Sequence, residues 1–405
     1  MTRRATILLA MFLLVYTAIN YYFSVALIVS GLVHVPFTRW VSFFFVVMTL
    51  SPLLVSGSWG ALPVMVRYVV GTIAFYWTAT MMQFLFWSLM FKAFRAVGQA
   101  VLNLLDVSWR LPEGGYADFA YPLTITFAIT AYGFWEATQI KVVEYEIRSE
   151  KVPQGLPRFR IVQMSDLHLG MLENRWRLER VLTKVEGVKP DLVVSTGDLT
   201  DVHLQDREWL VERLKRLTPP FGKFAVTGNH EVYEGLTSAV TFLKEAGFQP
   251  LQGAAVQVTA FLGLAGVDDD DAVGMGLIPE PDEVDILSRL SAQGFRLFLK
   301  HTPKVDPRTL GRFDLQLSGH THGGQIFPLI LVQFLVYGFG IGLNDLGKGS
   351  RLLLNRGAGT WGPPIRVLAP PEVCVIDLLP SVHFSPDCRL KSSSNIAGCK
   401  SNPKA

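Results

Sequence analysis

The sequence predicts a globular α/β domain that follows a membrane-spanning helical region. The chain of 405 residues is 50% hydrophobic and only 18% charged, and its mean hydropathy is +0.31. These values are too apolar for an ordinary soluble protein of this length. The longest apolar runs fall in residues 1–140. Beyond residue 158, short β-branched runs alternate with segments of helical periodicity, which favours an α/β fold.

Residues 1–140 contain four long apolar runs. They are Thr6–Val33, Trp40–Val55, Tyr68–Phe91 and Phe119–Ile140. Because about 20 apolar residues suffice to cross the hydrocarbon core of a bilayer, we expect an integral, multi-pass membrane region of about four spans.

Basic residues near the ends of these runs bear on the orientation of the chain. Five of them flank the helical region: Arg3, Arg4, Lys141, Arg148 and Lys151. Three between the third and fourth runs favour the opposite orientation: Lys92, Arg95 and Arg110. An even number of spans places both ends of the region on one side. The positive-inside rule then favours the cytoplasmic face for the globular domain.

We divide the chain into four parts. Residues 1–140 form the transmembrane helical domain, and residues 141–157 form a polar linker that ends in Pro153-Gln154-Gly155-Leu156-Pro157, a sequence typical of a domain boundary. Residues 158–380 form the globular domain, which is long enough for one large core. Residues 381–405 are rich in Ser, Lys and Asn and are predicted to be disordered.

Alternation of two kinds of segment defines the globular domain. The predicted strands are Arg160–Met164, Asp191–Ser195, Phe224–Thr227, Phe261–Val267, Arg296–Lys300, Phe313–Ser318, Arg351–Asn355 and Val373–Leu378. The predicted helices are Glu173–Glu186, Leu204–Leu217, Leu236–Ala246 and Glu283–Gln293. Their apolar positions recur with the 3.6-residue spacing of a helix.

Charge and cysteine content exclude some classes of function. A net charge of +3 gives no indication of nucleic-acid binding. The three cysteines, Cys374, Cys388 and Cys399, form no C-x-x-C pair, so neither a disulfide framework nor a cysteine-based zinc site is expected. Cys374 lies in a predicted strand and is expected to be a buried thiol. The sequence does not indicate an oligomeric state.

Residues that commonly bind metals follow one predicted strand after another. They are Asp166 and His168, Asp198, Asn229 and His230, His301, and His320 and His322. These turns hold five of the eight histidines, and imidazole is the commonest metal ligand among side chains. Ligands of α/β folds gather at the carboxyl ends of strands. The placement therefore predicts a metal site at that edge of the sheet.

In this order the residues resemble the calcineurin-like metallophosphoesterases. The family pattern D-x-H, G-D, G-N-H-[DE], H and G-H-x-H corresponds here to Asp166/His168, Gly197-Asp198, Gly228-Asn229-His230-Glu231, His301 and Gly319-His320-Thr321-His322. The membrane-associated branch is the most similar, because Gly323-Gly324-Gln325 and the turn Arg356–Pro364 also match. That branch includes multi-span proteins with a metallophosphoesterase domain and hydrolases of UDP-2,3-diacylglucosamine. The resemblance implies a four-layer α/β/β/α sandwich.

The resemblance also implies two divalent metal ions. One would be held by Asp166, His168, Asp198 and His322, and the other by Asp198, Asn229, His301 and His320. A carboxylate such as Asp198 can bridge two cations. Mixed nitrogen and oxygen ligands suit Mn, Fe or Zn without selecting one of them.

Two residues of the third turn are implied to act on the substrate. By resemblance His230 faces the phosphate and stabilises or protonates the leaving oxygen. Glu231 would orient His230 by accepting a hydrogen bond from it. The alternative interpretation of Glu231 is a solvated loop acid.

Together these features predict a membrane-anchored enzyme that hydrolyses a phosphate ester or pyrophosphate bond by means of a metal-bridging hydroxide. Tethering to a bilayer favours a lipid-linked substrate. One alternative is a phosphodiesterase for a soluble nucleotide, for which the spans serve only as an anchor. The other is a non-enzymatic metal-binding membrane sensor, which would be expected to have lost ligands, whereas none is missing here.

Three further segments have competing interpretations. Gly357–Gly362 matches G-x-G-x-x-G, but Pro363-Pro364 follows and prevents the helix that a dinucleotide site needs. We therefore predict a glycine turn near the metals. Asp268–Asp271 lacks the spacing of a calcium loop and is predicted to be a solvated turn. Ile326–Leu343 is either core or an apolar loop that contacts the membrane interface beside the metals.

Overall fold

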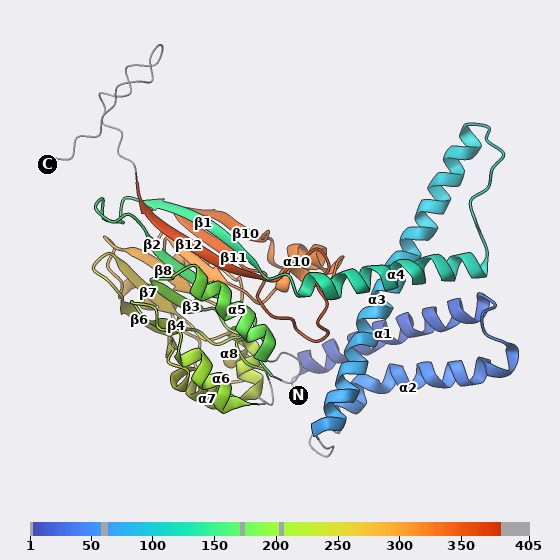
Figure 1. Ribbon diagram of the computed structural model, residues 1–405, viewed down its shortest axis with the longest axis horizontal. Helices are drawn as coiled ribbons and strands as arrows, with labels where there is room; N and C mark the ends of the chain where they lie inside the picture. Colours follow the sequence, from blue (N-terminus) through green and yellow to red (C-terminus); the bar gives the residue numbers. More distant parts are fainter. Residues whose placement is uncertain (1–2, 58–63, 171–174, 202–205, 382–405) are drawn as a thin grey trace, which may run out of the picture.

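The structure is a computed structural model that describes residues 3–57, 64–170, 175–201 and 206–381. It consists of a globular α/β part and an extended helical part (Figure 1). Residues 382–405, most of the predicted disordered tail, lie outside the described residues.

The first sheet of the globular part has six strands in the order β1-β12-β2-β3-β4-β5. They are β1 (Lys141–Ser149), β12 (Glu372–Pro380), β2 (Phe159–Met164), β3 (Leu192–Ser195), β4 (Lys223–Ala225) and β5 (Gln249–Pro250). Neighbours pair in parallel except β12 and β2, which are antiparallel. The carboxyl ends of β2, β3 and β4 therefore meet at one edge.

The second sheet also has six strands, in the order β10-β11-β9-β8-β7-β6. They are β10 (Gly342–Gly347), β11 (Ser350–Leu354), β9 (Leu315–Ser318), β8 (Phe295–Leu299), β7 (Leu262–Gly266) and β6 (Ala254–Gln257). The four central strands are parallel, and β10 and β6 pair antiparallel at the two edges. The α/β class predicted from the sequence is confirmed.

The two sheets pack face to face through a layer of buried aliphatic and aromatic side chains. Ile161 and Val194 of the first sheet share this cluster with Leu264, Leu297 and Leu317 of the second. Burying one such side chain fully contributes about 1.5–3 kcal/mol. The mixed sheets are thereby held with their ligand-bearing turns at a common edge.

Helices cover the outer faces of both sheets. The first sheet carries α5 (Arg175–Gly187), α6 (Arg207–Lys215) and α7 (Asn229–Glu245). On the second sheet, α9 (Glu283–Ser288) packs its Ile286 and Leu287 against Phe298. Two short helices complete the globular part: α8 (Asp270–Gly274) and α10 (Leu329–Tyr337).

The predicted linker, residues 141–157, is wrong at its start because it contains a strand. Strand β1 pairs with β12 along its whole length, from Lys141 opposite Glu372 to Ser149 opposite Pro380. The missed signal is the alternation of apolar and charged residues in Val143-Glu144-Tyr145-Glu146-Ile147. That alternation is typical of a strand with one buried face, and its charges protect the open edge of the sheet.

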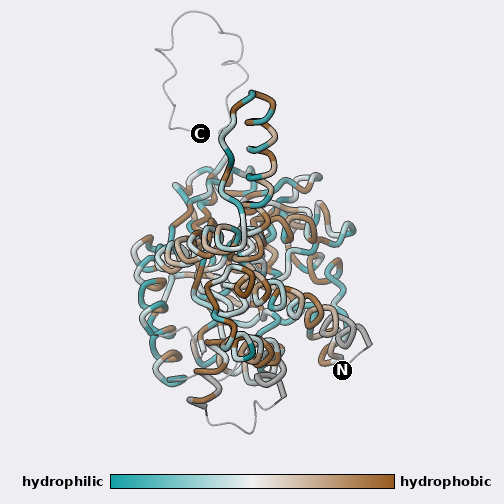
Figure 2. Tube along the Cα trace, turned by 90° about the vertical axis from the view of Figure 1, so that its right-hand side faces the viewer, coloured by the Kyte–Doolittle hydropathy of each residue, from teal (hydrophilic) through white to brown (hydrophobic). Residues whose placement is uncertain are grey.

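The four apolar runs form four helices, α1 (Arg3–Val29), α2 (Thr38–Gly57), α3 (Val64–Leu104) and α4 (Gly115–Ala137). Among the described residues two segments are long and apolar enough to cross a membrane, Ala10–Val29 and Val69–Leu104, while Val35–Ser51 is a shorter apolar helix. Four spans are therefore not confirmed. In Figure 2 the helical part points toward the viewer, and brown, hydrophobic segments recur on its helices among white and teal ones.

Helix α3 continues well past its predicted end at Phe91, to Leu104. Lys92 and Arg95 thus lie within the helix rather than in a loop. The Lys92 ammonium donates to the Tyr22 hydroxyl at 3.0 Å, and Arg95 pairs with Asp118.

Candidate metal centre

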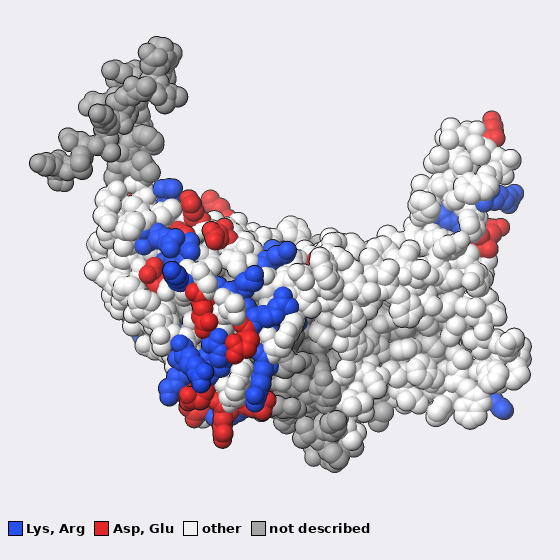
Figure 3. All heavy atoms as spheres, in the orientation of Figure 1, with Lys and Arg blue, Asp and Glu red and all other residues white. Residues whose placement is uncertain are grey.

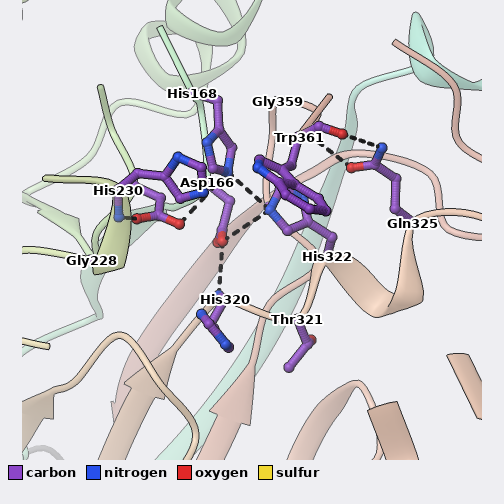
Figure 4. A network of polar contacts seen from close by, with 12 residues as sticks. Asp166, His168, Gly228, His230, His320, Thr321, His322, Gln325, Gly359 and Trp361 are labelled. Carbon is purple, nitrogen blue, oxygen red and sulfur yellow. Dashed lines mark hydrogen bonds and ion pairs between the residues drawn. The ribbon is translucent and has the colours of Figure 1, made fainter. Parts of the chain in front are cut away.

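The predicted ligands lie at the carboxyl ends of strands from both sheets. Asp166 and His168 follow β2, Asp198 follows β3, and Asn229 begins α7 after β4. In the second sheet His301 follows β8, and His320 and His322 follow β9. Because the two sheets face each other, these five turns converge at one site, part of which is shown in Figure 4.

Many of these residues have backbone conformations that side chains rarely adopt. Positive φ angles occur at Asp166 (51°), His168 (49°), Asp198 (50°), His320 (71°) and His322 (51°). Asp and His tolerate the left-handed region better than most residues do. Such strain concentrates at functional sites, where the surrounding structure holds it in place.

Glycines next to the ligands let neighbouring turns approach closely. A Cβ on Gly319 would overlap the Asp166 carboxylate, and one on Gly228 would overlap the Asp198 carboxylate. A Cβ on Gly357 would lie 2.6 Å from that of Asp166. The last glycine belongs to the predicted Gly357–Gly362 turn, where Gly359 also donates its N–H to the Asp166 carbonyl at 2.9 Å. This segment has no helix, as the prediction of a turn near the site requires.

The first group of donor atoms comes from Asp166, His168 and His322. The Nε2 atoms of His168 and His322 lie 3.0 Å apart, and His322 Nε2 lies 3.4 Å from Asp166 Oδ1. Asp198 Oδ2 lies 3.7 Å from His168 Nε2. All four residues are buried.

The second group comes from Asp198, Asn229, His301 and His320. His301 Nε2 lies 3.2 Å from Asp198 Oδ2 and 3.1 Å from Asn229 Oδ1. The same amide oxygen lies 3.0 Å from His320 Nδ1. His301 Nδ1 donates to the Thr196 carbonyl at 2.7 Å, which directs Nε2 into the site. The carboxylate of Asp198 therefore faces both groups.

These donor atoms fit divalent cations. Burial lowers the pKa of His168 and of His320 to about 4 and lowers the pKa of His322 well below its usual value. The three imidazoles are therefore neutral at pH 7, which is the form that binds a metal. Asp166 Oδ2 and His168 Nδ1 are buried and have no hydrogen-bond partner among the described residues.

Asp198 carries the charge expected of a shared ligand. Burial alone would raise its pKa, but His301, followed by His168 and His230, lowers the pKa well below its usual value. Groups of possible metal ligands form around Asp166, His168 and His322 and around Asp198, His301 and His320. All seven predicted ligands are thus brought together.

His230 lies beside the donor groups and is held by a residue that the sequence did not indicate. Its Nδ1 donates to Asp201 Oδ1 at 2.8 Å, and its backbone N–H donates to Asp198 Oδ1 at 2.9 Å. Burial opposes the charged imidazole, but the hydrogen bond to Asp201 and the nearby carboxylates raise the pKa of His230 to about 9. Asp201 could have been suspected only because it shares a turn with Asp198.

Both predicted interpretations of Glu231 are wrong. Its side chain is fully buried and accepts no hydrogen bond from His230. It accepts instead from four backbone N–H groups, those of Asp198, Leu199, Thr200 and Gly228, at 2.7–2.9 Å. Glu231 therefore fastens the turn that holds Asp198 to the start of α7.

The predicted solvated turn, Asp268–Asp271, is also wrong in part. Asp268 and Asp269 are buried, and Asp269 Oδ2 accepts the Thr302 hydroxyl at 2.7 Å. Since Thr302 follows His301, this acid supports the backbone of a donor turn.

The edge of the site contacts the helical part through loops that follow donor turns. Ile326 and Phe327, shortly after His322, join Ile365 and Val367 in a cluster with Ala79 of α3. Gln83 of α3 donates to the Phe327 carbonyl, and the rings of Phe86 and Phe327 lie 5.3 Å apart.

Trp361 and Arg366 extend this contact. The Trp361 ring lies 6.2 Å from His230 and 6.3 Å from Phe75 of α3. The buried Arg366 donates its backbone N–H to Gly133 of α4 at 3.0 Å and its guanidinium to the His322 carbonyl at 3.2 Å. The helical part therefore packs directly on the border of the donor cluster.

Two facing mixed sheets with Asp, Asn and His donors at their common edge define a metal-binding α/β protein. Residues 159–324 match the family model described as calcineurin-like phosphoesterase. The chain is 38% identical over 255 residues to an "Uncharacterized metallophosphoesterase" of Aquifex aeolicus, a match that covers 63% of this chain and 97% of the relative. The chain belongs to the calcineurin-like metallophosphoesterase family, a hydrolase family that uses divalent metals.

Two further relatives are covered to different extents. The Bacillus subtilis protein "Uncharacterized metallophosphoesterase YkuE" is 33% identical over 275 residues, which cover 62% of this chain and 92% of that protein. A Danio rerio protein named "Transmembrane protein with metallophosphoesterase domain" is 30% identical over 310 residues, covering 73% of this chain and 70% of the relative.

Proposed function

We propose that this metallophosphoesterase is a membrane-anchored, binuclear enzyme that hydrolyses a phosphate ester or pyrophosphate bond of a lipid-linked substrate. Asp166, His168, Asp198 and His322 would hold one cation, and Asp198, Asn229, His301 and His320 the other. When bound, the cations would supply a nucleophile at neutral pH and neutralise charge on the phosphoryl oxygens. Mn, Fe and Zn all suit this donor set.

The residues of the chain would position the substrate and move the proton. His230 would donate the proton on Nε2 to the leaving oxygen, while Asp201 holds Nδ1 at 2.8 Å and keeps the ring oriented. Asn229 would offer an oxygen without adding negative charge, which would otherwise repel a phosphate. Glu231 would keep the turns of Asp198 and Asn229 in register.

Membrane anchoring would use all four helices, α1 to α4, with residues 1–140 as the transmembrane domain and the α/β/β/α phosphoesterase sandwich following it. On the face shown in Figure 3 the charged residues gather over the globular part, and the helical part carries them mainly at its far end. The Danio rerio match covers 73% of 405 residues, about 296, whereas residues 141–405 number only 265. That match therefore extends into the helical region.

A cytoplasmic position of the catalytic domain is part of the proposal. Arg3 and Arg4 are the first residues of α1, and Lys141 begins β1 shortly after α4; four spans would place these residues on the same side of the membrane. Lys92 and Arg95, which favoured the opposite orientation, are engaged with Tyr22 and Asp118 inside the helical part. Because Lys92 and Arg95 are not loop charges, they count less against a cytoplasmic position of the catalytic domain.

A single observation carries the choice of a lipid-linked substrate. The loops that leave the donor turns pack on α3 and α4, as Phe327 does on Phe86 and Trp361 on Phe75. A substrate that stays anchored in the bilayer could therefore reach the donor cluster along these apolar helices. Hydrolysis of a soluble nucleotide would not require a contact between these loops and the helical part.

The test uses the full-length protein in lipid nanodiscs with added Mn²⁺, supplied with a lipid extract or with bis-p-nitrophenyl phosphate. We expect release of phosphate or of a nucleoside monophosphate from the extract. Asp198→Ala and His230→Ala variants that remain folded should release neither product. Turnover of only soluble esters would favour the soluble-nucleotide alternative. No turnover of either substrate by a folded, metal-loaded protein would favour a sensor.

A further inference from the structure

Helix α10 combines an apolar sequence with exposure to solvent. It has nine residues, Leu-Ile-Leu-Val-Gln-Phe-Leu-Val-Tyr, and residues 315–344 around it contain no Asp, Glu, Lys or Arg. Five large side chains are exposed: Leu331 (58%), Val332 (52%), Phe334 (55%), Leu335 (82%) and Val336 (66%). A helix that is apolar on all sides is normally buried in a core or a membrane, so something apolar should cover this one.

The most polar side chain of α10 has a hydrogen-bond partner within the chain, as burial in hydrocarbon requires. Gln333 is its one strongly polar side chain; it is buried, and its amide donates to the Phe339 carbonyl at 2.8 Å. The helix ends at Tyr337 and is capped by Gly338, whose N–H donates to the Phe334 carbonyl at 2.8 Å. A protein partner would usually meet a polar rim around such a patch. Residues 315–344 supply no charge for one, and the charged side chains that act on α10, such as Lys304 and Asp270, do so at its Tyr337 end.

The position of α10 points to the bilayer as the apolar phase that covers it. Phe327, two residues before the helix, packs edge-on against Phe86 of α3. In Figure 1, α10 lies on the side of the globular part that faces the helical part. Through Phe327, α10 is thus joined directly to a helix proposed to span the membrane.

We propose that α10 is an interfacial helix that inserts its exposed apolar side chains among the acyl chains of the bilayer in which α1 to α4 are embedded. The proposal rests on the membrane anchoring proposed above. Leu335, at 82% exposure, would lie deepest. Tyr337, an amphipathic side chain suited to the headgroup level, would lie at the surface.

Insertion at this place would set the height of the metal centre above the bilayer. A Cβ on Gly324 would overlap the backbone of Ile330, so the start of α10 is pressed against the turn of His322. At the other end, the Tyr337 ring lies 5.9 Å from the His320 ring, edge to face. An inserted α10 would therefore hold both histidine donors close to the headgroups, where a lipid-linked phosphate lies.

The test places an environment-sensitive fluorophore at position 335. Leu335→Cys is made in full-length protein carrying Cys388→Ser and Cys399→Ser, since the remaining cysteine, Cys374, is buried. The protein is reconstituted into phosphatidylcholine vesicles with and without nitroxide-labelled lipid. Phe221→Cys is the matched control. Phe221 is 41% exposed and precedes β4, at the sheet edge opposite the donor turns.

We expect the label at 335 to emit at shorter wavelength and to be quenched several-fold more strongly by the nitroxide lipid than the label at 221. Equal emission and quenching at the two positions would overturn the proposal. Shielding of position 335 from aqueous quenchers without quenching by lipid would also overturn it, because a protein surface would then cover α10.

A second measurement separates this proposal from the proposed substrate. Phe334→Ser with Leu335→Ser should lower turnover of a lipid phosphate several-fold and leave bis-p-nitrophenyl phosphate turnover unchanged. An inserted α10 in a protein that hydrolyses no lipid phosphate would refute only the substrate. Lipid phosphate turnover unaffected by the double substitution, with no lipid quenching at 335, would refute only the insertion.

Discussion

The metal centre and α10 touch through His320 and Tyr337, yet they are built in opposite ways. Donor residues of the centre are polar and mostly buried, and several have strained backbone angles. Most side chains of α10 are apolar, and five large ones are exposed. In the metal centre, function depends on the position of each donor atom. In α10, membrane insertion would depend only on the total exposed apolar surface.

This difference should appear in the size of mutational effects. Removing one atom from the centre breaks an arrangement that no neighbour can replace. Removing one apolar side chain from the border of the site subtracts a share of a surface that its neighbours maintain. If substitutions at the border of the site had larger effects than substitutions in the metal centre, the proposed contrast between the two regions would be wrong.

The largest effect is expected for Asp198→Asn. The carboxylate faces both donor groups, at 3.2 Å from His301 and 3.7 Å from His168, and an amide removes its charge. We expect kcat/KM on bis-p-nitrophenyl phosphate to fall about 10³-fold or more, as for a residue that acts with a whole site, together with loss of bound metal by elemental analysis. Asp285→Asn, an exposed acid on α9, is the control. Retention of both metals and activity would contradict the shared role.

Glu231→Gln should have the next largest effect, because Glu231 holds the turns that carry the metal donors but is not itself a donor. Four backbone N–H groups converge on this carboxylate, and an amide would turn its NH₂ toward some of them. We expect metal affinity to fall about 10–100-fold and the protein to lose about 2–4 kcal/mol of stability. Calorimetric titration and thermal unfolding measure the two effects.

Glu234→Gln is the matched control, since Glu234 lies one turn further along α7 and accepts from the Thr200 hydroxyl at 3.1 Å. Similar losses of metal affinity and stability in both variants would show that Glu231 has no special role in holding the donor turns.

The sequence predicted the metal centre better than its surroundings. Ligands such as Asp166 and His320 stand directly after strands, so local position along the chain predicts their convergence. Glu231 escaped correct prediction because its partners are backbone N–H groups of another turn, which carry no side-chain signature. Asp201 was missed because an acid three residues after Asp198 has many equally plausible roles.

Outside the metal centre, the composition of a segment predicted its secondary structure less completely than the position of a residue predicted its place in the site. The apolar runs predicted all four helices of residues 1–140, but hydropathy did not reveal that α3 continues beyond Lys92 and Arg95 to Leu104. Partners in space, Tyr22 and Asp118, accommodate these charges. Strand β1 had a local signal in the alternation from Val143 to Ile147, but its partner β12 lies more than two hundred residues away in the chain, so the pairing itself was not visible in the sequence.

Asp201→Asn should produce an effect that depends on pH. The hydrogen bond from His230 and the charge of Asp201 help to raise the pKa of His230 to about 9, so the imidazole keeps its proton until the pH rises through that value. Without the charge the pKa falls, and the proton is lost at lower pH. We expect about a 10-fold loss of kcat near pH 8 and a smaller loss near pH 6, scaled by the effect of a residue that orients a catalytic side chain.

A pH–rate profile of kcat distinguishes this role from a structural one. The alkaline limb should move to lower pH in Asp201→Asn, and Asp201→Glu should restore part of the shift. A uniform loss at all pH values would instead indicate that the substitution only disturbs the turn.

The smallest effect is expected at the border of the site, for Trp361→Ala. The indole is 51% exposed and lies between Phe75 and His230, while Gln325 holds its backbone through hydrogen bonds of 2.8 and 2.9 Å. Loss of one aromatic contact corresponds to about 0.5–1.5 kcal/mol, so turnover of a lipid phosphate should fall about 2–10-fold. Turnover of bis-p-nitrophenyl phosphate should change less, because this soluble ester would not approach along the helices.

Trp176→Ala is the control, since Trp176 lies on α5 and is equally exposed. Equal losses on both substrates would mean that Trp361 serves the metal centre itself, and the contrast between centre and border would then fail at this residue.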